Sequence, residues 1–294
     1  MKLIQLKLFR DIAYEKSFVK AAQINFMTQP SVSVHLKQLE EELGVRLFDR
    51  VPRRVILTPE GKVYLQHVEE ILNKCDNLLA LPGTLGTSLK GEVRIASIHS
   101  IGMYELGPFL RSFMQQYPGI RIHLEYQAAY KVYDLVQKRK AHLGMVAYPE
   151  KHIKIQSITY GKDQLGLIVP ANHHLAQKDR IRLQQIEGEP FVAFETSTPT
   201  REQIDKFLKK KNIQTKIKMT NNNIYALKKA VEAGIGISLV PLSTVDDEVQ
   251  RGTIRKVKIV GMNLYRPLAL LISKKYPVNQ VTEVFMDALL AYNN

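Results

Sequence analysis

A long amphipathic segment at residues 59–81 separates two stretches of this chain that differ in hydrophobic periodicity. Thr58, Pro59 and Glu60 form a typical helix start: a capping Thr, a Pro at the first helical position and an acid facing the positive helix end. Glycines and small polar residues over 82–90 predict a linker after it. Before this helix apolar residues recur at helical spacing, whereas from residue 91 onward strands alternate with helices. We therefore expect a helical N-terminal module, a long helix and a larger α/β domain.

The apolar residues of the long helix are spaced as in a coiled coil. One stripe follows intervals of four and three, and a second lies beside it; the stripes are Tyr64, Val68, Ile71, Cys75 and Leu78, and Leu65, Leu72 and Leu79. A helix with two apolar stripes is not expected to stand alone in water. The pattern therefore predicts that the helix pairs with a second copy of itself, with Cys75 packed in the seam rather than acting as a redox sensor.

Three shorter helices are predicted in the first 44 residues. The first covers residues 3–13; the second, about 18–26, is capped by Ser17 and is expected to direct Val19, Ala22 and Phe26 inward. The third starts after Thr28 and ends at Gly44, a residue type that favours helix termination. Its expected inner face is Val32, Leu36, Leu39 and Leu43, and its outer face carries Gln29, Ser33 and Lys37 with His35 alongside.

The second and third helices have the form of a helix-turn-helix. Small residues at Ala21 and Ala22 suit a close helix crossing, and in this motif the following helix lies in the major groove of DNA. Gln29 can make paired hydrogen bonds to adenine, while Ser33 and Lys37 suit phosphate or guanine. The net charge of +14 also favours a polyanionic partner. A structural three-helix bundle with a solvated polar face is the alternative.

The chain from residue 91 predicts an α/β domain of about two hundred residues, with parallel sheets buried on both faces and enough length for two lobes. Residues 151–220 hold 13 basic and 7 acidic residues, which mildly favours an anionic small-molecule ligand. One cysteine excludes an internal disulfide and every Cys-rich zinc site. No export signal and no long apolar run is visible, so we expect a cytoplasmic protein with no membrane partner.

Several segments resemble one known family. In the N-terminal part these are Ser17-Phe18-Val19-Lys20-Ala21-Ala22, Thr28-Gln29-Pro30-Ser31-Val32-Ser33, Leu36-Lys37-Gln38-Leu39-Glu40-Glu41-Glu42-Leu43-Gly44-Val45, Arg46-Leu47-Phe48-Asp49-Arg50 and Leu57-Thr58-Pro59-Glu60-Gly61. Looser matches are Arg94-Ile95-Ala96-Ser97, Gln116-Tyr117-Pro118, Ala233-Gly234-Ile235-Gly236-Ile237 and Val240-Pro241. Together they resemble LysR-type transcriptional regulators over the whole chain.

The resemblance implies an architecture and a set of partners. It implies a winged helix-turn-helix over 1–58, a dimerising linker helix and hinge over 59–90, and an effector domain over 91–294 that is similar to periplasmic binding proteins. Lobe I would be 91–161 with 267–294, and lobe II 162–266. The implied partners are double-stranded DNA with an interrupted palindrome, a small metabolite, and further copies of the chain in a dimer and a tetramer.

The resemblance also implies site residues. Those expected to contact DNA are Thr28, Gln29, Pro30, Ser31, Ser33, His35 and Lys37, with Arg53 and Arg54 in the wing. Those expected to contact effector are Ser97, His99, Ser100, Thr200 and Asn222. Two departures stand out: Val34-His35, where Arg or Gln is commoner, and Gln127-Ala128-Ala129, which lacks the usual hydroxyl and indicates a changed effector.

A second class of function is an enzyme or solute-binding protein whose helical N-terminus only oligomerises. An enzyme should show a convergent acid, base or nucleophile set, and none is found in the sequence. No phosphate-binding loop of the GxxxxGK type and no HExxH motif is present, so neither a cofactor nor a metal is expected. His173 and His174 are adjacent and are expected to be solvated rather than ligands. The sequence therefore favours the regulator over the enzyme.

Overall fold

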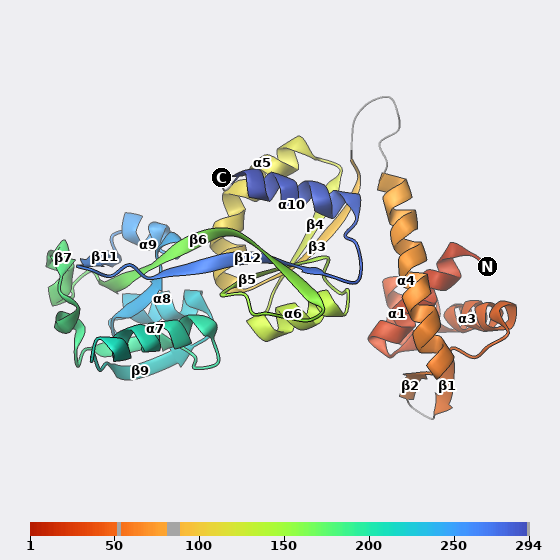
Figure 1. The fold of residues 1–294 in the computed structure, drawn as a ribbon, viewed down its shortest axis with the longest axis horizontal. Helices are drawn as coiled ribbons and strands as arrows, with labels where there is room; N and C mark the ends of the chain where they lie inside the picture. Colours follow the sequence, from red (N-terminus) through yellow and green to blue (C-terminus); the bar gives the residue numbers. More distant parts are fainter. Residues whose placement is uncertain (52–53, 81–88, 293–294) are drawn as a thin grey trace. The chain divides into compact units, whose positions relative to one another are not determined.

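We describe the protein in a computed structural model that covers residues 1–51, 54–80 and 89–292 (Figure 1). The chain forms two compact units, Met1–Gly83 and Thr84–Asn294. Within the described residues, no helix is both long and apolar enough to cross a membrane.

The N-terminal unit contains four helices and one β-hairpin in its described residues. The elements are α1 (Leu3–Glu15), α2 (Phe18–Ile24), α3 (Gln29–Leu43), β1 (Phe48–Val51), β2 (Arg54–Leu57) and α4 (Pro59–Ala80). The three predicted caps are present: Ser17 Oγ accepts from the Lys20 amide at 3.3 Å, Thr28 Oγ1 from Ser31 at 3.4 Å, and Thr58 Oγ1 from Gly61 at 2.8 Å. Gly44 ends α3 with a φ of 68°.

The second helix packs differently from the prediction. Asn25 is its C-terminal cap and Phe26 follows at a φ of 53°, so the Phe26 side chain is 97% exposed. Val19 is 55% exposed, and only Ala22 of the three predicted inward residues is buried, beside Ala21. The two alanines are small enough to bring α2 against α1 and α3, which leaves the larger apolar residues of α2 outside the core.

The long helix α4 is used in part by its own unit. Val68 and Leu72 are buried in the N-terminal core, and Tyr64 and Leu65 pack against that core. Ile71 remains 38% exposed. The prediction that the stripes pair with a second copy is therefore wrong for Val68 and Leu72, which are buried within their own unit, where α4 packs against α1. The side chains of Leu78 and Leu79 lie outside the described residues.

The C-terminal unit alternates strands and helices. Its first elements are β3 (Gly91–Ser97), η1 (Ile101–Glu105), α5 (Leu106–Gln116), β4 (Ile120–Tyr126), α6 (Ala129–Gln137), β5 (Leu143–Ala147) and β6 (Ile155–Pro170). The middle elements are η2 (His174–Gln177), β7 (Arg180–Ile181), η3 (Leu183–Ile186), β8 (Pro190–Phe194), α7 (Pro199–Lys210), β9 (Lys216–Asn221) and α8 (Ile224–Glu232). The last are β10 (Ser238–Pro241), η4 (Leu242–Thr244), α9 (Asp246–Gln250), β11 (Ile254–Ile259), β12 (Tyr265–Ser273) and α10 (Gln280–Tyr292).

The sheets of this unit are mixed, which corrects the expectation of purely parallel sheets. The main sheet has the order β4-β3-β5-β12-β6-β11-β7, with β10 also paired to β6. β3 is parallel to β4 and β5, and β8 is parallel to β9, whereas β12 runs antiparallel to β5 and β6. The chain passes from the first part of the unit to the second along β6 and returns along β12, so these two strands pair antiparallel.

β6 and β12 join two lobes, as Figure 1 shows. The first part of β6 pairs with β12 as far as Gln164, and its last residues, from Leu165, pair with β10 and β11. The C-terminal helix α10 packs against β3 and α5, where Phe285 meets Phe109 edge to face. The chain thus returns to the first lobe after the second is complete.

A buried guanidinium lies where β6 and β12 cross between the lobes. Arg266 on β12 is 1% exposed and donates from Nε and Nη2 to Asp163 Oδ2 on β6, at 3.1 and 2.8 Å. Its Nη1 donates to Ser100 Oγ at 2.8 Å. Because an unpaired buried charge is strongly destabilising, Asp163 and Ser100 hold Arg266 in place.

The same carboxylate connects the lobes through one hydroxyl. Ser243 Oγ in η4 lies 2.9 Å from Asp163 Oδ2 and 2.8 Å from Glu105 Oε1 in η1. A hydroxyl has a single proton, so it cannot donate to two ionised carboxylates. Asp163 is already paired with Arg266, so the arrangement is satisfied when Glu105 is protonated. Burial raises the pKa of Glu105, and the nearby Asp163 charge raises it further.

This arrangement predicts a pH-dependent stability. A raised folded-state pKa means that the contribution of Glu105 is complete below its ordinary value of 4.5 and is lost as pH rises through the folded value. Urea unfolding of the wild type against Glu105→Gln should show the wild type losing stability relative to the variant as pH rises from about 4.5 to 8. Glu187→Gln, at an exposed carboxyl, is the control. Parallel pH profiles for wild type and Glu105→Gln would refute the protonated assignment.

Candidate nucleic-acid interface and effector site

The third helix presents a row of polar side chains to solvent. Gln29 and Lys37 are exposed and Ser33 is half-buried. Gln29 Nε2 donates to Ser33 Oγ at 2.9 Å, and Lys37 Nζ lies 3.5 Å from Glu41 Oε1. The Gln29–Ser33 bond restricts the glutamine side chain before any ligand arrives, which lowers the entropy that a base contact would cost.

The other predicted residues of this helix have different surroundings. Thr28 uses its hydroxyl as the helix cap, while Pro30 is exposed and Ser31 half-buried. His35 is half-buried, and its Nδ1 is buried without a hydrogen-bond partner among the described residues. His35 thus lies alongside the outer face, as predicted, but is half-buried rather than fully exposed.

The hairpin carries one of the two predicted wing arginines in its described part. Arg54 begins β2 and is exposed, beside a hollow of about 280 Å³ that Glu40, Arg46 and Asp49 also line. Arg53 lies outside the described residues. The hairpin is held to α3 because the amides of Leu47 and Phe48 both donate to Glu40 Oε1, at 2.7 and 3.3 Å.

In the C-terminal unit, the register of β3, β4 and β5 places the first predicted effector loop, which follows Ser97, beside the ends of the neighbouring strands. Ser97 at the end of β3 pairs with Tyr126 of β4 and Met145 of β5, and the Gln127 amide donates to the Ser97 carbonyl at 2.9 Å. The carboxyl ends of parallel strands are where α/β proteins bind ligands. Residues 97–100 and 126–128 therefore lie along one edge of the sheet.

The side chains of this loop are already engaged. Ser97 is buried and donates to the Ile98 carbonyl at 3.1 Å, and Ser100 is buried and accepts from Arg266. The Ser100 hydroxyl keeps its own proton to donate to a ligand. His99 stacks on Tyr126 with ring centroids 5.6 Å apart, and burial lowers the pKa of His99, which keeps the imidazole neutral at pH 7.

The second lobe has a similar edge. Phe194 and Asn221, the last residues of β8 and β9, are in register, so the loops that start α7 and α8 are neighbours. Thr200 is buried in the first turn of α7, and Asn222 is exposed. Asn221 Oδ1 accepts from the Asn223 amide at 2.8 Å, so Asn221 organises the turn. No hydrogen bond joins Thr200 to Ser100 among the described residues.

Sequence reasoning missed Asp163, Arg266 and Tyr126 as parts of this region. Arg266 stands beside the apolar run that begins at Leu268, and a charge in such a place was the available signal. Its partner is 103 residues away in sequence, which no local pattern reveals.

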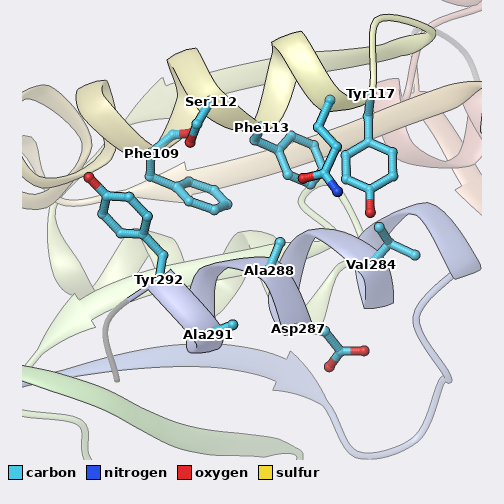
Figure 2. Close-up of a pocket in the computed structure, with 10 residues that line it drawn as sticks. Phe109, Ser112, Phe113, Tyr117, Val284, Asp287, Ala288, Ala291 and Tyr292 are labelled. Atoms are coloured by element: carbon cyan, nitrogen blue, oxygen red, sulfur yellow. The ribbon is translucent and has the colours of Figure 1, made fainter.

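A separate groove lies between α5 and α10. Figure 2 shows its aromatic walls, formed by Phe109, Phe113, Tyr117 and Tyr292, around a volume of about 560 Å³. None of the predicted effector residues lines it.

His173 and His174 are joined by Glu189, which the sequence did not indicate. Glu189 carboxylate oxygens lie 3.5 Å from His173 Nε2 and 3.4 Å from His174 Nε2. However, His173 Nδ1 accepts from the Leu175 amide at 3.3 Å, so the proton of a neutral His173 is on Nε2. That nitrogen then faces Glu189, and the possible ligand atoms of His173, His174 and Glu189 all lie within 4.8 Å of one another.

Comparison with known families matches both units. Residues 3–62 match the bacterial regulatory helix-turn-helix protein of the lysR family, and residues 86–294 match the LysR substrate binding domain. A probable RuBisCO transcriptional regulator of Cyanidioschyzon merolae is 31% identical over 90% of each chain. The transcriptional activator CmpR of Synechocystis is 28% identical over 99% of this chain and 95% of its own.

Solved structures have the same fold. A full-length OxyR variant of Pseudomonas aeruginosa superposes with a TM-score of 0.73 at 21% identity, covering 98% of this chain and 94% of its own. The regulatory domain of Synechocystis CcmR in complex with 2-PG gives a TM-score of 0.64 at 23% identity, over 70% of this chain and 98% of its own. The chain therefore belongs to the LysR family of transcriptional regulators: it binds DNA through its helix-turn-helix and responds to a small molecule through its effector domain, and it is not an enzyme.

Proposed function

We propose that the protein binds an interrupted palindrome with α3 in the major groove of each half-site. The polar row of α3, with Gln29 already oriented by Ser33, carries this proposal. The proposed DNA contacts are Thr28, Gln29, Pro30, Ser31, Ser33, His35, Lys37, Arg53 and Arg54. We propose a cytoplasmic location, where the protein can reach its operator.

We propose that residues 1–58 form the DNA-binding domain, 59–90 the linker helix and hinge, and 91–294 the effector domain. Lobe I is 91–161 with 267–294, and lobe II is 162–266. The pairing of β6 with β12 on one side and with β10 and β11 on the other supports this division.

Self-association through the exposed face of α4 gives a dimer, and a pair of dimers gives a tetramer.

The proposed effector is a small anion bound between the lobes. Contacts are assigned to Ser97, His99, Ser100, Thr200 and Asn222. Support comes from the loops that begin η1, α7 and α8, which can present backbone amides to an anion. CcmR, a structural relative, was solved with 2-phosphoglycolate, a ligand of this class.

Base recognition is tested by Gln29→Ala. Loss of a bidentate base contact should lower discrimination between the selected and a random duplex by about 1–3 kcal/mol in a titration at fixed salt. Gln23→Ala, at an exposed glutamine of α2, is the matched control and should change nothing. If Gln29→Ala leaves discrimination intact, α3 does not read bases as proposed.

Assembly is tested by Ile71→Asp. A carboxylate buried in an apolar interface should weaken the dimer by about tenfold or more, which sedimentation velocity would show as smaller species. Gln66→Asp adds the same charge to another exposed position of α4 and should leave the dimer intact. An unchanged distribution for Ile71→Asp would remove α4 from the interface.

Effector binding is tested with 2-phosphoglycolate as the probe. Ser100→Ala and Thr200→Val should each weaken its calorimetric affinity by about tenfold, as expected for a hydrogen bond to a charged ligand. Thr200→Val should leave ligand-free operator affinity nearly unchanged, whereas Ser100→Ala also removes a hydrogen-bond acceptor from the buried Arg266, so thermal unfolding of both variants is measured alongside. Ser112→Ala, in the groove between α5 and α10, is the control. A double variant that binds the probe normally would place the effector elsewhere.

A further inference from the structure

Val34 is an apolar residue in the middle of an otherwise polar helix surface. It is 54% exposed, and it is the one large apolar side chain of α3 that is exposed to this degree. Its neighbours one turn away along the surface, Pro30 and Gln38, are exposed as well. Because α3 is described in full, this contrast covers every residue of the helix.

Helix geometry places Val34 directly away from the core. At about 100° per residue, the buried Val32 and Leu36 each lie roughly 160° around the helix from Val34, and the buried Leu39 lies roughly 140° away. Packing within the unit therefore does not account for a valine here. Helix propensity does not favour it either, since β-branched residues are weaker helix formers than Lys, Gln or Glu.

The position is, however, one that meets DNA in the proposed complex. Val34 is the sixth residue of the 15-residue helix, in its first half, and the early residues of a recognition helix contact base edges. It lies beside the row of Gln29, Ser33 and Lys37. A valine offers no donor or acceptor to a base or a phosphate, so its contact must be apolar.

The major groove edge of the bases presents one apolar group, the C5-methyl of thymine. We infer that Val34 reads a thymine methyl in each half-site and is a specificity-determining residue of the operator complex. This inference rests on the proposed binding of α3 in the major groove. The ligand chemistry is a thymine at a fixed position of the half-site, next to the bases that Gln29 and Ser33 contact.

The test removes the methyl group without changing any hydrogen bond. The preferred duplex of the full-length protein is first selected from a randomised pool, and each thymine of the half-site is then replaced in turn by deoxyuridine. Burial of one methyl group is worth about fourfold in affinity, so the wild type should lose roughly fourfold at one position per half-site. Substitution at the remaining thymines should have little effect.

The variant Val34→Ser completes a double-mutant cycle. It should bind the thymine duplex more weakly than the wild type and be insensitive to the deoxyuridine at that same position. Val19→Ser is the matched control, because Val19 is equally exposed at 55% but lies on α2, and it should retain the wild-type response to deoxyuridine. Thermal unfolding of both variants checks that each is folded.

Each failure has its own meaning. A selected palindrome without a methyl-sensitive thymine, or a methyl effect that persists in Val34→Ser, would overturn the inference while leaving the DNA-binding proposal intact. If the wild type selects no sequence, both the inference and the proposed palindrome recognition fail.

Discussion

The hydrogen bonds of the buried Arg266 guanidinium to Asp163 and Ser100 are the interactions on which the effector domain depends. A guanidinium at 1% exposure requires both of its partners, and these come from β6 and from the loop after β3. The pair therefore fixes where the two crossing strands meet and, through Ser100, how the first effector loop sits. Ser243 then brings η4 of the second lobe to the same carboxylate. A ligand that competes for Ser100 would act on the contacts that hold the two lobes together.

In the N-terminal unit, α4 has one face packed in the core and another face exposed to solvent. α4 contributes Val68 and Leu72 to the core beneath the helix-turn-helix and still leaves Ile71 to solvent. Because the inner face of α4 supports α1, a partner that engages the outer face is mechanically connected to the DNA-binding helices. Burial of the inner stripe in the same core also fixes the start of α4 relative to the hairpin.

Local signals predicted much of this structure. The caps Ser17, Thr28 and Thr58 and the terminating Gly44 set helix boundaries through contacts within a few residues, so they are legible in sequence. The parts that sequence missed depend on distant contacts. The long β6 with its antiparallel partner β12, and the Arg266–Asp163 pair, follow from how remote segments meet. The exposure of Phe26 has a local cause, because α2 ends at Asn25 and the next residue takes a positive φ. The sequence indicated the loops of the proposed effector site, but it did not indicate that Arg266 would engage Ser100.

Hydroxyl-radical footprinting of the full-length protein on its selected duplex, with and without 2-phosphoglycolate, tests the central claim most directly. A regulator that places two α3 helices on one face of the DNA should protect two patches whose centres are separated by whole helical turns of about 10–10.5 base pairs. Effector binding should change the extent or spacing of those patches. A uniform footprint without two half-sites, or one that an effector bound to the C-terminal unit leaves unchanged, would contradict the account.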